Sequence, residues 1–480
     1  MKTIAFAAVI VSLYNIATAQ NYQAIHGSMY SGSLGIYNNP ATGIHTPYNW
    51  DLTLFSGQSK SSTNAFTSDK PLLQLANSRV YLANGDKKRF IHMSEDAHLL
   101  NARFKWDQRR AFAFGFNSRN YVHVKSQPFK FVDTISTFKS FLKFNSPTPL
   151  IGGNVVNNSW AEIYVSYSQI LRKTNLDQLS AGITLKAIRG VSGLYVQLDK
   201  MQFTETTLAG STSSFVLTDA NGKYGYSSNY DKLKEDKTSR KNLNDFLTYT
   251  QGSMGIDLGV EYLVKTDYVP QYDQEEKLEY EWKIGISLLD LGKNLFKYGQ
   301  YSREFSGVQP NITEVELENK FSSLDNLDDF YDSLETVVQQ LNSPGTKFYV
   351  WQPTRLVVNV DKAITDNFFI NGELNVNLFS TQNKNTHHTR EMNLITVTPR
   401  WETSFFGVYL PVQVNTQGQL WIGSAFKAGP LLLGIHDWRW VFSKDHVFNG
   451  GAYLAVVVRN FFSSSSSKSK RIKYMECVNL

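Results

Sequence analysis

Long stretches of this chain place an apolar residue at every second position, and clusters of Asn, Asp, Gly and Ser separate these stretches. Residues 110–116 are the clearest example, because three phenylalanines share one face while two alanines and a glycine share the other. A period of two is typical of β-strands with two different faces. A soluble core strand usually carries polar residues opposite its rings. Large rings opposite small residues therefore favour a strand that contacts lipid on one side and a crowded interior on the other.

The rest of the composition agrees with strands rather than membrane helices. The chain has 480 residues, of which 42% are hydrophobic, 14% aromatic and 19% charged. After Leu13 no apolar run approaches the ~20 residues that a spanning helix needs. Alternation runs almost continuously instead, which favours one large barrel over several soluble domains. We therefore predict an all-β fold, an antiparallel transmembrane β-barrel.

The alternating stretches predict about 14 strands, an even number as closed bacterial barrels require. They begin near residues 50, 99, 110, 159, 179, 252, 280, 354, 368, 393, 405, 419, 431 and 448. Connections at one end of the barrel are short, and those at the other end are long, at 120–157, 199–250, 291–353 and 380–392. This asymmetry is typical of short periplasmic turns and long outer loops.

Both ends of the chain carry segments that lie outside the strand pattern. Lys2 precedes an apolar stretch from Thr3 to Leu13, and Ala17-Thr18-Ala19 forms an A-x-A cleavage site. This arrangement predicts a secretory signal peptide over residues 1–19. Residues 463–480 contain a serine run followed by Lys and Arg, which predicts a flexible basic periplasmic tail.

Residues 20–48 precede the first strand and do not alternate. They are rich in Gly, Asn, Ser and Tyr and contain the sequence Asn38-Asn39-Pro40-Ala41. Pro40 restricts Asn39 to extended conformations, and the asparagine side chains bond nearby backbone groups. A stiff segment that satisfies its own backbone suits a plug inside a wet lumen. The alternative is an ordinary Asn-Pro turn before the first strand.

Several charged residues fall within the predicted strands, namely Asp257, Glu261, Glu281, Lys283, Glu373 and Arg400. A lipid-facing Lys or Arg costs roughly 2–4 kcal/mol at the bilayer midplane, so we expect these charges to face the lumen or the membrane interface. Inside the lumen they would line a route for a solute or hold the plug in place. Mutual pairing inside a permanently closed plug is the alternative.

One outer loop contains a helical pattern. Apolar residues recur at helical spacing after Ser323, at Leu324, Leu327, Tyr331, Leu334, Val338 and Leu341. Acidic residues in the first turns and Ser343-Pro344-Gly345 at the end predict a helix over 323–342. We expect its apolar stripe to cap the barrel mouth, with a partner-binding helix as the alternative.

The sequence lacks the motifs of common catalytic and metal sites. No G-x-S-x-G, Walker A, H-E-x-x-H, EF-hand or G-x-G-x-x-G motif is present. His387-His388 is the only histidine pair and no carboxylate or cysteine pattern accompanies it, while the single Cys477 excludes an internal disulfide. The net charge of +6 is modest for this length. We expect no enzymatic activity, no cofactor, no metal and no nucleic-acid partner.

The N-terminal sequence GSMYSGSLGIYNNPATG, followed by the strand sequence WDLTLFSG, resembles the FadL-like outer-membrane transporters. In that family an Asn-Pro-Ala motif belongs to an N-terminal hatch that plugs the barrel, and the motif matches Asn39, Pro40 and Ala41 here. The sequence resembles still more closely an uncharacterised group of related barrels, through His26-Gly27, the Asn-Pro-Ala motif and Asp51 to Leu54. The shuttle barrel of the type IX secretion system is a more distant relative of this kind.

The resemblance implies four segments: a signal peptide (1–19), a hatch (20–48), a transmembrane barrel (49–462) and the periplasmic tail (463–480). It places the protein among the lipids of the outer membrane of a Gram-negative bacterium. One hypothesis is a barrel that passes a hydrophobic or amphipathic small molecule, with Asn38 to Ala41 in the hatch that gates it. The other hypothesis is a platform without transport that binds secreted or surface proteins through its long outer loops.

Overall fold

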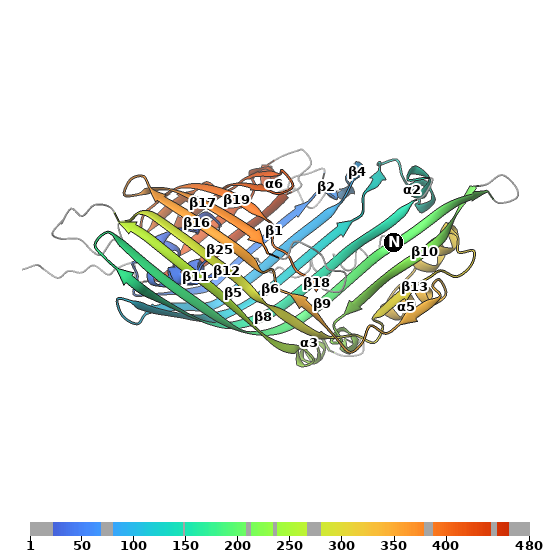
Figure 1. Cartoon of the computed structure of the whole chain (residues 1–480), viewed down its shortest axis with the longest axis horizontal. Helices are drawn as coiled ribbons and strands as arrows, with labels where there is room; N and C mark the ends of the chain where they lie inside the picture. The colour runs from blue at the N-terminus through green and yellow to red at the C-terminus, as the bar shows by residue number, and fades with distance from the viewer. Residues whose placement is uncertain are drawn as a thin grey trace, which may run out of the picture.

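The computed structural model describes residues 23–68, 80–146, 149–207, 213–233, 238–265, 280–378, 387–442 and 449–459. These residues form a closed antiparallel β-barrel of 14 strands with an extension at one end (Figure 1). The predicted fold class and strand number are thereby confirmed. The predicted signal peptide and the predicted tail lie outside the described residues.

The barrel strands follow one another in chain order. They are β1 (Trp50–Thr63), β5 (Phe90–Lys105), β6 (Arg110–Ser126), β8 (Leu150–Lys173), β9 (Asp177–Thr207), β11 (Gln251–Lys265), β12 (Tyr280–Lys297), β16 (Arg355–Ala363), β17 (Phe368–Asn377), β19 (Leu394–Glu402), β20 (Phe406–Tyr409) with β21 (Val412–Asn415), β22 (Leu420–Ile422) with β23 (Ser424–Ala428), β24 (Leu431–Ile435) and β25 (Asn449–Arg459). β20 and β21 count as one strand because both pair with β19, and β22 and β23 continue the next strand in the same way. β25 pairs with β1 along its length and closes the sheet.

Apolar side chains cover the outside of the barrel. On β6, Phe114 and Phe116 are exposed while Ala111 and Ala113 are buried, as the alternation predicts. Other outward apolar residues come from strands all round the barrel and include Leu54, Ile163, Leu185, Leu258, Ile286, Leu374, Val397, Val408, Ile422 and Leu433. Exposed aromatic residues gather near the end with short connections, at Trp50, Trp106, Trp282, Phe368, Trp401 and Phe406. An apolar band bordered by aromatic rings is the surface that a bilayer requires of a β-barrel.

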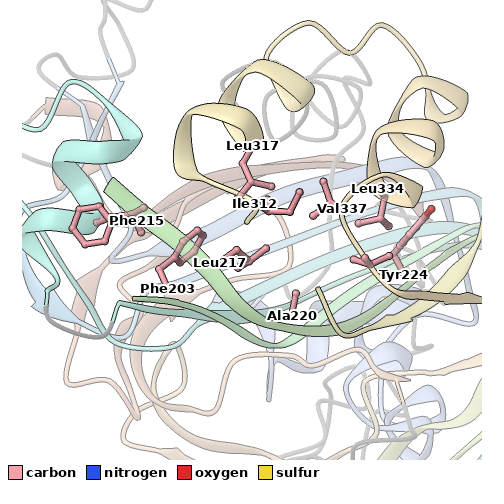
Figure 2. Packing of buried hydrophobic residues seen from close by; sticks show 11 residues of the cluster. Phe203, Phe215, Leu217, Ala220, Tyr224, Ile312, Leu317, Leu334 and Val337 are labelled. Atoms are coloured by element: carbon pink, nitrogen blue, oxygen red, sulfur yellow. The ribbon is translucent and has the colours of Figure 1, made fainter. Parts of the chain in front are cut away.

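β8 and β9 are longer than the other strands and continue beyond the apolar band. Their outer halves join β10 (Ser213–Tyr226), β13 (Arg303–Ser306) and β14 (Gln340–Asn342) in a sheet that we call the extension. The helices α2 (Phe138–Phe144), α4 (Glu314–Phe321) and α5 (Leu327–Glu335) pack on this sheet. Figure 2 shows the apolar core between them, formed by buried residues that include Phe203, Phe215, Leu217, Ile312 and Leu334. The extension therefore has a core of the kind found in water-soluble domains.

The predicted helix over 323–342 is confirmed only for α5. Asn326 caps its first turn, and the chain leaves the helix after Glu335. The predicted end is wrong because Val337 and Val338 enter the core of the extension and residues 340–342 pair with β13 as a strand. The apolar side of α5 packs on this core through Leu334. Among the described residues, no helix is long and apolar enough to cross a membrane.

A charge placed in the apolar band tests whether the band contacts lipid. Ile286 on β12 is 45% exposed and lies between outward neighbours on both sides. We expect Ile286→Arg to lower the free energy of unfolding by roughly 2–4 kcal/mol in lipid vesicles, the cost of an arginine near the midplane. Denaturant titrations followed by tryptophan fluorescence measure this change. Thr365→Arg, in an exposed turn, is the matched control, and equal losses in the two variants would contradict a lipid-facing band.

Candidate functional site

The hatch occupies the lumen of the barrel. Its described part forms three 3-10 helices, η1 (Gln23–Ile25), η2 (Met29–Tyr37) and η3 (Pro40–Ile44), which lie within the strands in Figure 1. Nearly all of these residues are buried. The hatch leads directly into β1 at Trp50, so it lies in the half of the barrel that has the short connections. Residues 23–48 therefore occupy this half of the lumen, as expected of a plug.

The Asn-Pro-Ala motif forms the start of η3. The Asn39 side chain accepts a hydrogen bond from the Ala41 N–H at 2.9 Å, and Pro40 occupies the first helical turn, where it needs no N–H partner. The same Asn39 side chain donates to the Val260 carbonyl at 3.0 Å. The motif thus caps a helix and also ties the hatch to the wall, which an ordinary turn would not do.

Glycines in the wall leave room for this motif. A Cβ at Gly182 would lie 2.4 Å from the carbonyl carbon of Pro40, and a Cβ at Gly259 would lie 2.0 Å from Oδ1 of Asn39. Gly182 is on β9 and Gly259 on β11, two strands that pair with each other. Any larger side chain at either position would occupy the space of the hatch. The fit between the Asn-Pro-Ala motif and the wall therefore depends on glycine at both positions, because glycine has no side chain.

Polar side chains hold the hatch against the wall. His26 Nδ1 lies 2.5 Å from Oε2 of Glu373, and Ser28 donates to Glu402 at 2.7 Å. The Ser33 N–H donates to Asp51 at 2.7 Å, and further along the hatch the Tyr37 and His45 side chains also bond to wall residues, as does Asn38. Each such bond contributes a net ~1 kcal/mol, because water would otherwise take the place of the partner. Water molecules are consequently able to replace the partners in these polar contacts of the hatch.

Three apolar clusters of described residues join the hatch to the wall, and the one with the most members lies in a single sector of the barrel. Ala24, Ile25 and Leu34 of the hatch pack with residues from β20, β23, β24 and β25, namely Tyr409, Ala425, Leu432, Tyr453, Ala455 and Val457. The outer face of the same wall carries an apolar groove of about 710 Å³, lined by residues that include Val408, Phe426, Leu433, Trp438 and Leu454. Both faces of the wall are therefore apolar at this place.

A layer of paired charges crosses the lumen beyond the hatch. Asp290 lies at its centre, with its carboxylate 2.5 Å from Arg119, 2.7 Å from Lys186 and 3.2 Å from Arg355. Asp290 has a φ of 58°, which a residue other than glycine rarely adopts. Its N–H bonds Asp257 at 2.7 Å. Buried charges of this kind persist because each has partners, and loss of one partner typically costs about 3–5 kcal/mol.

A second ionic group lies beside the start of the hatch, where Arg400 also donates to the Gly27 carbonyl at 3.4 Å. Arg400 pairs with Asp361 and, at 2.9 Å, with Glu402, which also accepts the hydrogen bond from Ser28 of the hatch. These side chains are at most 1% exposed. The hydrogen bond of Ser28 and the ion pairs of Arg400 therefore belong to one connected network.

The structure brings most of the predicted strand charges together in the lumen. Asp257 and Glu373 take part in the contacts described above, and Arg400 is the centre of the second ionic group. Glu261 lies 3.4 Å from His45 of the hatch. The Lys283 amine lies 5.3 Å from the centroid of the Tyr280 ring.

Glu281 differs from the other predicted charges. Its side chain is 45% exposed and pairs with Lys362 at 2.6 Å. The pairing of β11 with β12 shifts between Val264 and Lys265, whose partners are Trp282 and Tyr280. Glu281 is the extra residue of this bulge and loses the inward direction that strict alternation would give it.

A second segment enters the lumen at the end with long connections. Residues 380–392 are predicted as an outer loop, but residues 387–393, where the described chain resumes, turn into the barrel. His387 stacks on Tyr195 at 3.6 Å between ring centroids, Thr389 accepts a bond from Asn158 at 2.9 Å, and Glu391 pairs with Lys60 at 3.5 Å. The histidine pair is thus part of the packing of the barrel mouth. Within the described ranges, no group of three or more metal-ligating side chains comes together.

Sequence reasoning missed Asp290, Arg119, Arg355 and Glu391. Arg119 continues the inward positions of β6, so extending the alternation beyond Asn117 would have found it. Asp290 sits at a local irregularity of β12, and Glu391 lies in a returning loop. No period of two indicates the position of either residue.

Comparison with known proteins places the chain in a family. A family model described as "Family of unknown function (DUF5723)" matches residues 40–435. The chain belongs to this family. No curated protein matches its sequence.

Solved structures resemble the chain over most of its length. A TodX mutant described as a monoaromatic hydrocarbon channel has 8% identity, a TM-score of 0.39 and coverage of 89% of this chain and 94% of its own. A FadL homologue from Pseudomonas aeruginosa has 10% identity, a TM-score of 0.23 and coverage of 92% and 98%. The siderophore receptor PirA from Pseudomonas aeruginosa has 8% identity, a TM-score of 0.19 and coverage of 86% and 81%. At these values the resemblance adds nothing to what the strand pairing already shows.

Substitution of Gly182 tests whether the position of the hatch depends on the space that this glycine leaves for Pro40. We expect Gly182→Val to displace Pro40 and to accelerate hydrogen exchange of hatch amides about tenfold, because overpacking costs ~1–3 kcal/mol. Hydrogen exchange with mass spectrometry measures the change. Gly252→Val is the matched control, since a Cβ there meets only the Ile188 carbonyl oxygen at 3.9 Å. Equal exchange rates in the two variants would show that the position of the hatch does not depend on the contact between Pro40 and Gly182.

Proposed function

We propose that this protein is an outer-membrane barrel of a Gram-negative bacterium that passes a hydrophobic or amphipathic small molecule, with the hatch as its gate. The observation that carries the proposal is the attachment of the hatch, which combines hydrogen bonds that water is able to replace with a few small apolar clusters. The apolar band and its aromatic border support a location in a bilayer. The FadL-like pattern around Asn39-Pro40-Ala41 supports the same class of protein.

The construction of the hatch suits a part that moves. It consists of short 3-10 helices, and none of the named β-strands belongs to it. Its contacts to the wall are hydrogen bonds and three small apolar clusters, which contain Leu34, Ile36 and Ile44. A stably fixed plug would gain more from strand pairing or from a larger apolar core. The hatch therefore resembles a removable part more than a permanent filling.

The apolar sector provides a surface for the transported molecule. Ile25 and Leu34 face Leu432 and Val457 of the wall, and the outer groove with Trp438 lies on the other side of that wall. A hydrophobic molecule prefers such surfaces to the ionic layer around Asp290. Movement of the hatch would expose this sector to the lumen.

A reversible crosslink between hatch and wall tests the gate. The side-chain oxygens of Ser33 and Thr53 lie 2.8 Å apart, a separation that suits replacement by a disulfide. We expect cells that produce Ser33→Cys/Thr53→Cys in a Cys477→Ser background to take up radiolabelled oleate or toluene when reduced. Uptake should fall to the level of cells without the protein on oxidation and return on reduction.

The two single-cysteine variants are the controls for the crosslink, and oxidation should leave their uptake unchanged. Failure of the reduced protein to raise uptake of either probe would contradict transport of these hydrophobic classes. Uptake that persists in the crosslinked protein would contradict gating by the hatch while leaving transport in place.

A platform that binds secreted or surface proteins is the second candidate, and the extension favours it. The extension projects beyond the apolar band and has its own core, which a simple channel does not need. Val315 on α4 is 53% exposed and Leu327 at the start of α5 is 42% exposed. We expect Val315→Ser/Leu327→Ser to abolish capture of a secreted partner by the full chain in nanodiscs, with Asn319→Ala as the control. Absence of any captured protein in the unaltered chain would count against this function.

A further inference from the structure

The helix α3 (Ser239–Thr248) lies on the outside of the molecule with an unpartnered apolar side. Thr238 caps its first turn, and none of its residues is buried. Phe246 contacts the Tyr230 ring at 5.2 Å between centroids and fixes the side that faces the protein. Leu243 is 59% exposed and Leu247 is 45% exposed. One helical turn separates these two leucines, so they form a short exposed apolar stripe next to the side that carries Phe246.

This stripe continues the apolar band of the barrel. α3 ends just before β11, whose outward residues are Met254, Leu258 and Val260. Met254 is 81% exposed and is the last large apolar residue of the band on this strand. The polar border follows at once, where Arg189 of β9 donates to Thr250 at 2.6 Å. α3 therefore stands at the rim of the band, at the end with long connections, and Figure 1 shows it beside the barrel wall.

Basic and aromatic residues accompany the stripe. Arg240 and Lys241 are exposed in the first turn of α3, and Tyr249 directly after the helix is 49% exposed. The Lys232 amine lies 4.7 Å from the centroid of the Tyr249 ring. Helices that lie in a membrane interface combine an apolar stripe, an aromatic residue and cations beside the polar headgroups.

We propose that α3 lies on the bilayer surface beside the barrel, with Leu243 and Leu247 in the boundary between headgroups and acyl chains and with Arg240 and Lys241 at lipid phosphates. The lipid surface is the occupant that the position of α3 requires, since the stripe is continuous with the lipid-facing band. The inference depends on the membrane location given under the proposed function but not on transport. α3 would then fix the depth of the barrel in the membrane and the height at which the extension stands above it.

Nitroxide labels test the position of α3. The full chain with Cys477→Ser is folded into vesicles of phosphatidylcholine and phosphatidylglycerol, and labels are attached to Leu247→Cys, Thr248→Cys or Leu258→Cys. Collision rates with oxygen, which enriches in lipid, and with a water-soluble nickel chelate give the depth of each label. Thr248 is exposed on another side of α3 and is the matched control, while Leu258 reports the apolar band.

We expect the ratio of oxygen to nickel collisions to be severalfold higher at position 247 than at position 248, and highest at position 258. A ratio at 247 as low as at 248, together with a high ratio at 258, would overturn the proposal while leaving the membrane location intact. A low ratio at 258 would contradict the membrane location itself and the proposal with it.

A second measurement tests the role of the cations. Arg240→Gln/Lys241→Gln in the Leu247→Cys background should lower the collision ratio at 247 in vesicles that contain phosphatidylglycerol. In vesicles of phosphatidylcholine alone the substitution should have a smaller effect, because fewer anionic phosphates face the helix. An unchanged ratio in both kinds of vesicle would overturn the role given to Arg240 and Lys241.

Discussion

The closure of the sheet is the constraint on which the rest of this structure depends. β25 pairs with β1, so every strand of the barrel has a neighbour on both sides and no edge remains open. Closure also gives each side chain one of two directions. Outward residues meet the surroundings and are apolar, whereas inward residues must find partners within a confined space. The apolar band and the filled lumen are two results of the same pairing.

The lumen satisfies this requirement mainly with polar contacts and small apolar clusters, whereas the extension uses one larger apolar core. Inside the barrel, Asp290, Arg400 and Glu391 each hold charged partners, and the hatch and the segment 387–393 supply further bonds. Outside the band, Phe203, Phe215 and their neighbours exclude water in the ordinary way. Polar contacts are exchangeable with water, so rearrangement inside the lumen would cost less buried apolar contact than rearrangement of the extension.

Much of the barrel is predictable from local pattern. The alternation of residues 110–116 and of 252–264 predicts both the strands and the direction of their side chains, because successive residues of a strand always point to opposite faces. The same pattern predicts that Asp257, Glu261 and Glu373 point away from lipid. The sequence before Trp50 predicts a separate segment, since it does not alternate. The Asn39-Pro40-Ala41 motif adds the expectation that this segment is a plug.

The remaining features arise only when the sheet closes and residues 387–393 fold back into the lumen. The seat of Pro40 requires Gly182 and Gly259 from two strands that are far apart in the sequence. The central position of Asp290 and the exposure of Glu281 follow from local irregularities in β12, and the burial of Glu391 follows from a loop that turns inward. The sequence by itself therefore determined the strands, their two faces and the separate hatch, because these depend on a period of two along the chain. Only the tertiary structure decided which side chains meet in the lumen, because those contacts join distant strands whose register no local period records.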